Sequence, residues 1–279
     1  MYRKILSAVN EHLNSENAAR YALNLAKACG AKLYLAFIAE SSLSRTAIEC
    51  AENAMRRLFL EAQEMDIPVE SIADTGDVVQ QIGRIVRKES IDLVFASTRR
   101  ADIQKRFYAG TTARNLSLHV PCSVALVRVV HAGRLQPSRI IVPLKARISH
   151  VKERALFAAK MAEAFHARVL LFHAPKPLTR LFRGEVHLTP LEWERRLPTS
   201  FSDFMKCLSQ YPIELGSHMV PGAVGRRIVT EAASKRHDLI IMGASQRGLL
   251  SSLWKGNPVE QVLRETPCNL IILRPAHED

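Results

Sequence analysis

The chain has 279 residues, a formal net charge of +12 at pH 7, and a composition that is 47% hydrophobic and 24% charged. This composition is typical of a globular protein and excludes wholesale disorder. Its apolar runs are far shorter than the roughly 20 residues of a membrane-spanning helix, and no signal peptide or membrane contact is predicted. The length predicts two ordinary domains.

The five cysteines and the positive charge give weaker indications. An odd number of cysteines without C-x-x-C spacing predicts reduced thiols in a cytoplasmic protein and no zinc site. The excess of 39 Lys and Arg over 27 Asp and Glu favours an anionic partner, such as a nucleotide or nucleic acid. Because the charges are scattered singly and in pairs, a merely solvated basic surface is the preferred interpretation.

The first half of the chain alternates short apolar strands with helices. Ile5–Val9 is expected to be the first strand, and Ser15 to cap a helix that Gly30 closes. Further strands are predicted at 32–39, 69–73, 93–97 and 123–129, and further helices at 45–65, 78–88 and 111–117. This alternation predicts a doubly wound parallel α/β sheet, in which ligands bind beyond the carboxyl ends of the strands.

The second half repeats the first. Asp92-Leu93-Val94-Phe95 returns 146 residues later as Asp238-Leu239-Ile240-Ile241, and Pro121-Cys122 returns as Pro267-Cys268. Near the start of each copy the offset is 135 or 136 residues, so the second copy carries about ten extra residues after its second strand. Two complete domains with five-stranded sheets are therefore predicted, at 1–132 and 139–279, with a linker at 133–138.

The loops after the two fourth strands have the spacing of a known family. In the second copy Gly243 is followed 13 residues later by Gly256-Asn257, then by a helix and Pro267-Cys268. In the first copy Ser97 and Gly110-Thr111 keep the same spacing. This order of strand, glycine loop, helix and Pro-Cys strand resembles the universal stress protein family, in a tandem form that covers nearly the whole chain.

The resemblance implies a Rossmann-like fold that binds ATP, ADP, AMP or another phosphate-bearing ligand, with Mg accompanying a nucleotide as the one metal expected. It also implies a non-enzymatic stress-response protein. The last strands of the two copies are expected to pair as an intramolecular pseudo-dimer, and a homodimer is compatible with this arrangement. The second copy is expected to be the main site. Its candidate residues are Val142, Pro143, Lys145, Ala174, Gly243, Gln246, Arg247, Gly256 and Asn257, and those of the first copy are Asn10, Ser97, Gly110 and Thr111.

Both copies depart from the family near the expected nucleotide. Nucleotide-binding members carry Asp at the end of the first strand, where this chain has Asn10 and Lys145. Arg100 and Gln246 replace the second glycine of the loop, and their side chains would crowd a triphosphate. The ammonium of Lys145 can donate but not accept hydrogen bonds, which favours a phosphate over ribose hydroxyls.

Two other functions stay open. An interaction module with ligand-free, degenerate sites would act through protein contacts alone, and a nucleic-acid binder would use the positive charge. The sequence contains no nucleic-acid recognition motif, and it has no G-x-S-x-G motif, P-loop lysine or paired acids for hydrolysis. A ligand-binding protein without enzymatic activity is therefore the leading hypothesis, although weak ATP hydrolysis stays open.

Overall fold

The computed structural model describes residues 2–98, 111–175, 198–244 and 258–276, together with the backbone of 179–180 and 184–185. The strands of the first half are β1 (Lys4–Val9), β2 (Lys32–Ala39), β3 (Val69–Thr75), β4 (Leu93–Ser97) and β5 (Ser123–Arg128). Those of the second half are β6 (Arg139–Leu144), β7 (Arg168–His173), β10 (Leu215–Met219), β11 (Leu239–Gly243) and β12 (Asn269–Arg274). A separate antiparallel pair, β8 (Thr179–Arg180) and β9 (Gly184–Glu185), follows β7.

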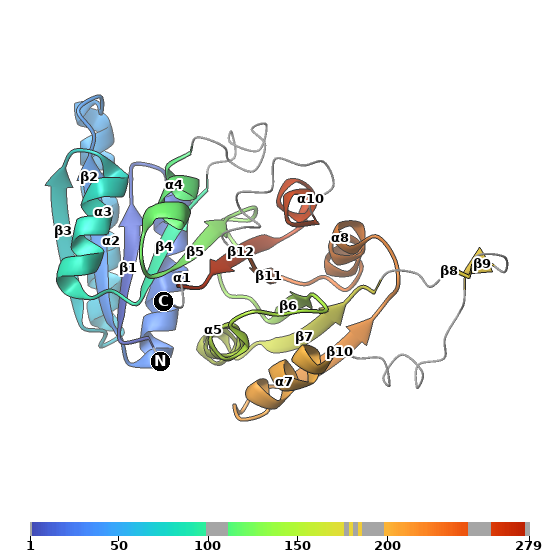
Figure 1. Ribbon diagram of the computed structural model, residues 1–279. Coiled ribbons are helices and arrows are strands. Elements are labelled where there is room, and N and C mark those ends of the chain that lie inside the picture. Colours follow the sequence, from blue (N-terminus) through green and yellow to red (C-terminus); the bar gives the residue numbers. More distant parts are fainter. Residues whose placement is uncertain are drawn as a thin grey trace.

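The main strands form one sheet of ten rather than two separate sheets of five (Figure 1). Its order is β10-β7-β6-β11-β12-β5-β4-β1-β2-β3. Neighbouring strands are parallel except at the centre, where β12 pairs antiparallel with β5, from Leu270 opposite Arg128 to Arg274 opposite Val124. The contact expected between the two last strands is therefore present. In each half the strand order reverses beside the first strand, where β1 lies between β4 and β2, and β6 between β11 and β7.

Helices cover both faces of this sheet. They are α1 (Leu13–Cys29), α2 (Arg45–Glu64), α3 (Val78–Glu89), α4 (Thr112–His119), α5 (Val151–Phe165), α7 (Thr199–Leu208), α8 (Val224–Ser234) and α10 (Pro258–Glu265). One apolar core contains the buried residues of α1, α2, α5 and α7, and the other contains those of α3, α4, α8 and α10. Each core layer thus runs through both halves. Across the described ranges, no helix combines the length and apolar composition that a bilayer crossing demands.

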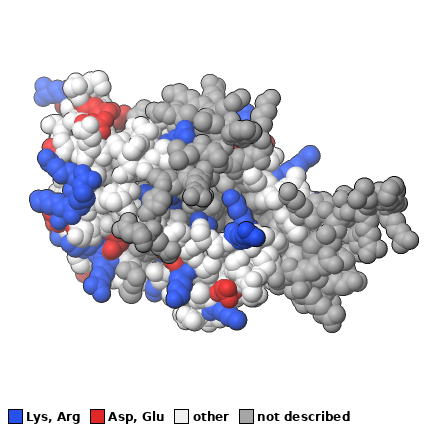
Figure 2. Space-filling model, viewed as in Figure 1, with Lys and Arg blue, Asp and Glu red and all other residues white. Residues whose placement is uncertain are grey.

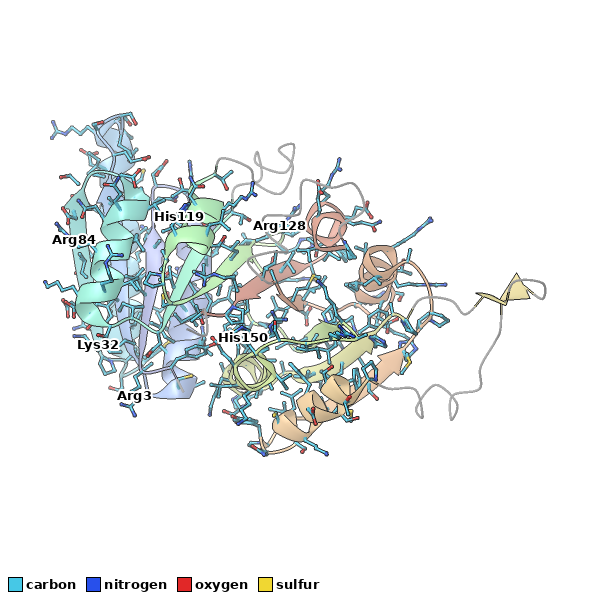
Figure 3. All side chains as sticks on the ribbon, in the orientation of Figure 1. Arg3, Lys32, Arg84, His119, Arg128 and His150 are labelled. Carbon is cyan, nitrogen blue, oxygen red and sulfur yellow. The ribbon has the colours of Figure 1, made fainter. Side chains whose placement is uncertain are left out.

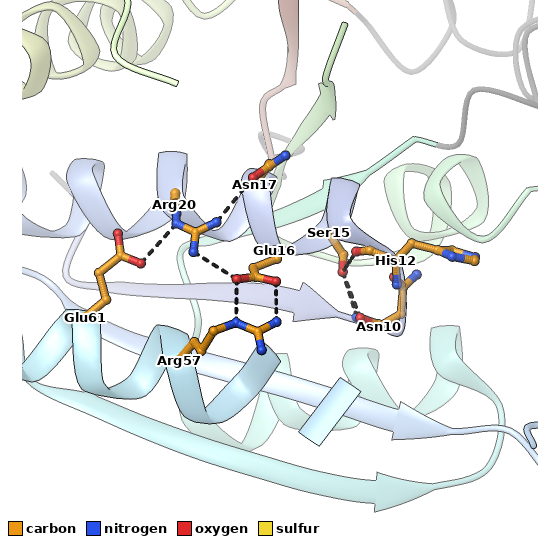
Figure 4. Close-up of polar contacts among 8 residues, drawn as sticks. All are labelled: Asn10, His12, Ser15, Glu16, Asn17, Arg20, Arg57 and Glu61. Carbon is orange, nitrogen blue, oxygen red and sulfur yellow. Dashed lines mark hydrogen bonds and ion pairs between the residues drawn. The ribbon is translucent and has the colours of Figure 1, made fainter. Parts of the chain in front are cut away.

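The start of α1 differs from the sequence prediction. The helix begins at Leu13, and His12 is its N-cap without a side-chain hydrogen bond. Ser15, predicted as the cap, lies inside the first turn, where its Oγ accepts from the backbone N of Asn10 at 2.9 Å and donates to the carbonyl of His12 at 2.8 Å. Ser15 therefore fixes the loop after β1 (Figure 4). The predicted end of the helix is confirmed, because Gly30 takes a left-handed conformation with φ 61°.

Asn269, the first residue of β12, joins the two halves to the segment that links them. Its Nδ2 donates to the hydroxyl of Tyr21 on α1 at 2.9 Å. Its Oδ1 accepts from the backbone N of Val130 at 2.8 Å and of His131 at 3.0 Å. One buried amide side chain thus holds α1, the connecting segment and β12 together.

The equivalent residue of β5, Ser123, makes a second polar contact across the seam between the halves. Its Oγ donates to Glu153 on α5, and the same carboxylate oxygen accepts from the hydroxyl of Tyr2 at 3.0 Å. Burial, followed by the charge of Glu153, raises the pKa of Tyr2 well above its usual value. Tyr2 therefore remains a hydrogen-bond donor at neutral pH.

Candidate functional site

At the switch point of the first half, a cleft of about 560 Å³ opens beyond the carboxyl ends of β1, β2 and β4. This volume lies in the range of roughly 300–1,000 Å³ that small-molecule sites have. Apolar side chains form much of its wall, among them Val9, Phe37, Ile38 and Leu116. The position matches the place where doubly wound sheets bind their ligands.

One end of this first-half cleft carries hydrogen-bond acceptors. Glu11 and Glu40, which follow β1 and β2, both line it. Asn10 also lines the cleft, and its Oδ1 accepts from the backbone N of His12 at 3.0 Å. The amide Nδ2 of Asn10 is then the atom that a ligand can engage. Two carboxylates and an amide suit a neutral group with several hydroxyls and amines better than they suit an anion.

The other end of the first-half cleft is formed by Ser97, at the end of β4, and by the start of α4. Thr111 is the N-cap of α4, and its Oγ1 accepts from the backbone N of Arg114 at 3.3 Å. Thr112, the first helical residue, is exposed and also lines the cleft. The first N–H groups of a helix lack intrahelical partners, so this end of the cleft favours a negative charge.

The corresponding cleft of the second half is much smaller, at about 40 Å³. Four of the residues predicted from sequence meet there: Val142, Pro143 and Lys145 at the end of β6, and Gly243 at the end of β11. Ala174 lies instead among the buried residues of the α8 and α10 core layer and is not part of the cleft lining. The predicted residues Gly110, Gln246, Arg247, Gly256 and Asn257 lie outside the described residues.

Arg154, on the first turns of α5, reaches into this second-half cleft and was not predicted as a site residue. Its Nη2 donates to the carbonyl of Ala244 at 3.1 Å, and a Cβ on Gly243 would overlap its Nη1. Because the guanidinium lies so close to the backbone, it leaves no room for a side chain at position 243. Burial lowers the pKa of Arg154. A comparison of the two copies could have singled out Arg154, because the equivalent residue of α1, 136 positions earlier, is Ala18.

Reactive groups are not assembled in the part of the chain that the structure describes. No three His, Cys, Asp or Glu side chains gather there as a metal site. The two cysteines that follow proline, Cys122 and Cys268, are free and buried, and burial raises the pKa of each to about 12. Their thiols are therefore protonated and unreactive at neutral pH. In the first-half cleft, the hydroxyls of Ser44 and Thr111 serve as helix caps.

The positive charge of the described surface is scattered and does not form one large patch. Figure 2 shows Lys and Arg in separate groups, with acidic and uncharged surface between them. Figure 3 places Lys32 and Arg84 on the outer side of the first half, away from His150 in the second. Lys32 pairs with Glu70 and Arg84 with Asp74, each at 2.7 Å. This distribution is typical of a solvated basic surface.

The duplicated strand order and the two switch-point clefts define a tandem, doubly wound α/β protein. The sequence profile of the universal stress protein family matches residues 1–128 and 138–274. The chain belongs to that family.

Several known proteins are similar to this chain. A universal stress protein structure from Archaeoglobus fulgidus has 18% identity and a TM-score of 0.65, over 99% of this chain and 97% of that one. The "Universal stress protein in QAH/OAS sulfhydrylase 3'region" of Thermus aquaticus is 26% identical over 125 residues, which are 45% of this chain and 90% of that protein. A family protein from Arabidopsis thaliana, solved with AMP bound, has 16% identity and a TM-score of 0.36, over 45% of this chain and 91% of that one.

Proposed function

We propose that the chain binds an adenine nucleotide in the first-half cleft and acts in stress responses through this binding, without catalysing a reaction. The carrying observation is the cleft of about 560 Å³ at the switch point of β1 and β4. It is large enough for a nucleotide, whereas the second-half cleft, at about 40 Å³, is not. The main nucleotide site is thus proposed in the first half, whereas the glycine pattern of the sequence favoured the second half.

The polarity of the first-half cleft supports this ligand class. A nucleotide has a neutral nucleoside, rich in hydrogen-bond donors, and an anionic phosphate tail. Glu11 and Glu40 can accept from the nucleoside, with its base against the apolar wall that includes Phe37. The start of α4, at Thr112, then takes the phosphate tail at the opposite end. Glu11 follows Asn10 directly, so its carboxylate can replace the Asp that the family's nucleotide-binding members carry one position earlier.

A binding role fits the described side chains of the cleft better than a catalytic one. Acid–base catalysis and hydrolysis need a nucleophile or water held by a base in a fixed hydrogen bond. The capping hydroxyls of Ser44 and Thr111 are already engaged with backbone N–H groups. One carboxylate oxygen of Glu11 already lies 3.1 Å from Nε2 of His12.

The proposal is tested by calorimetric titration of the full chain with AMP, ADP and ATP. We expect one nucleotide per chain. Thr112→Glu should abolish this binding, because a carboxylate at the start of α4 repels the phosphate while favouring the helix itself. The matched control is Pro258→Glu, which changes the equivalent first residue of α10 in the second half and should leave the affinity unchanged.

Two results would contradict the proposal. If the wild-type protein gives no heat and no thermal shift with millimolar nucleotide, the better hypothesis is an interaction module that acts without a ligand. If Pro258→Glu abolishes binding and Thr112→Glu does not, the nucleotide is bound in the second half, as the sequence pattern suggested.

A further inference from the structure

The small second-half cleft brings two cations together. The charged residues among its described lining are Lys145, which is exposed directly after β6, and Arg154, which is half-buried on α5. The rest of that lining is Gly243 and apolar side chains. Both side chains line the same small cleft, and burial, followed by the charge of Arg154, lowers the pKa of Lys145.

Arg154 also has a donor without an acceptor. Its Nη2 is bonded to the carbonyl of Ala244, but its Nε is buried and has no partner among the described residues. The adjacent carboxylate, Glu153, is engaged across the seam by Tyr2 and Ser123. A buried N–H of a cation that is left unbonded is costly, and an acceptor with negative charge would relieve both the lost bond and the repulsion.

We propose that the second-half cleft binds a small tetrahedral oxyanion between the ammonium of Lys145 and the Nε of Arg154. Inorganic phosphate and sulfate have this chemistry, and so does the terminal phosphate of a larger ligand. Charge-assisted hydrogen bonds from Arg and Lys are strong, and they match the several acceptor oxygens of such an ion. A volume of about 40 Å³ holds roughly three waters, which suits a small ion and not a nucleoside.

This site is independent of the nucleotide proposed for the first half. The two clefts are lined by different strands, β1, β2 and β4 in the first half and β6, β11 and β12 in the second. Failure of nucleotide binding would therefore leave the oxyanion site untouched, and the reverse also holds.

The test is a titration of the full chain with inorganic phosphate, sulfate and chloride at constant ionic strength, followed by calorimetry and thermal unfolding. Wild-type protein should bind phosphate and sulfate saturably and chloride not at all. Arg154→Gln and Lys145→Gln should each weaken phosphate binding about tenfold or more. Arg147→Gln is the matched control, because it removes one positive charge from the same loop at an exposed residue outside the cleft lining, and it should bind as the wild type does.

Three results would overturn the site. These are the absence of saturable phosphate binding by the wild type, unchanged affinity in both Arg154→Gln and Lys145→Gln, and loss of phosphate binding in Thr112→Glu, which would place the anion in the first half. If Arg154→Gln does not fold, Lys145→Gln decides alone. AMP is then added to the phosphate-loaded Thr112→Glu variant. If AMP competes with phosphate, the site takes the terminal phosphate of a larger ligand. If AMP does not compete, the site takes the free ion.

Discussion

The two halves of the molecule have the same strand order, but their switch-point clefts differ about fourteenfold in volume, 560 Å³ against 40 Å³. The larger cleft has the poorer glycine pattern, with Ser97 where the second half has Gly243. The second half keeps the glycine, yet the guanidinium of Arg154 lies against it. A glycine therefore indicates that something approaches the backbone closely, and that neighbour can be a side chain of the same chain rather than a ligand.

The largest effect is expected from a substitution at the seam where the two halves meet. Asn269→Ala removes the buried amide that bonds Tyr21, Val130 and His131, and should cost about 3 kcal/mol in the free energy of unfolding, because several buried groups lose their partners. Ser123→Ala, at the equivalent position of the first half, should cost about 1 kcal/mol. Urea denaturation of both variants measures the difference. Equal costs would show that the seam is held symmetrically.

A second prediction concerns a network that belongs to the first half (Figure 4). Glu16 on α1 is buried and accepts from Arg57 at 3.0 and 2.8 Å and from Arg20 at 2.8 Å. Hydrogen bonds from Arg57 are the main cause that lowers the pKa of Glu16. Glu16→Gln should cost about 1 kcal/mol at neutral pH.

The pH dependence of this cost has a definite sign. Because the folded pKa of Glu16 lies below the unfolded one, its contribution is complete above the unfolded pKa of about 4.3 and is lost as the pH falls through the folded pKa. The difference in melting temperature between wild type and Glu16→Gln should therefore shrink in acid. Lys152→Gln, the exposed equivalent on α5, is the control and should be neutral at every pH. A difference that grows in acid would contradict the assigned role of Glu16.

The smallest effect is expected from a variant that makes the second half resemble the first. Arg154→Ala restores the alanine that α1 carries as Ala18, removes the guanidinium from Gly243 and should open a weak second nucleotide site. Calorimetry with AMP should then give a stoichiometry above one per chain, whereas Arg147→Ala should not change it. An unchanged stoichiometry in Arg154→Ala would show that other side chains, such as Phe204, close this cleft.

Local patterns predicted the elements well where one residue type decides the backbone. The apolar run Leu93–Ser97 is β4 with its predicted bounds, and Gly30 ends α1 in the left-handed conformation that glycine tolerates. Ser15 was assigned wrongly, because a serine near a helix start has the same pattern whether it caps the helix or bonds back to the preceding loop. In this chain its partners are Asn10 and His12.

The candidate site could be predicted only in part. The sequence pattern correctly predicted that Lys145, after β6, and Gly243, at the end of β11, share one cleft. The carboxyl ends of adjacent parallel strands meet at one edge of a sheet. Arg154 could not be found in this way. It belongs to a helix without a motif, and its contact with Gly243 depends on how α5 packs on the sheet. The volumes of the two clefts likewise depend on side-chain packing.

The antiparallel pairing of β5 with β12 has a consequence for how the two halves can change. In a symmetric homodimer every substitution occurs twice, so a guanidinium that fills one cleft would fill the other as well. Here the two pairing strands belong to one polypeptide, and Arg154 occurs once, because the equivalent residue of the first half is Ala18. Covalent duplication also makes the association of the halves unimolecular, so dilution does not separate them. The continuous sheet thus permits permanent asymmetry, with one cleft kept open while the other is rebuilt.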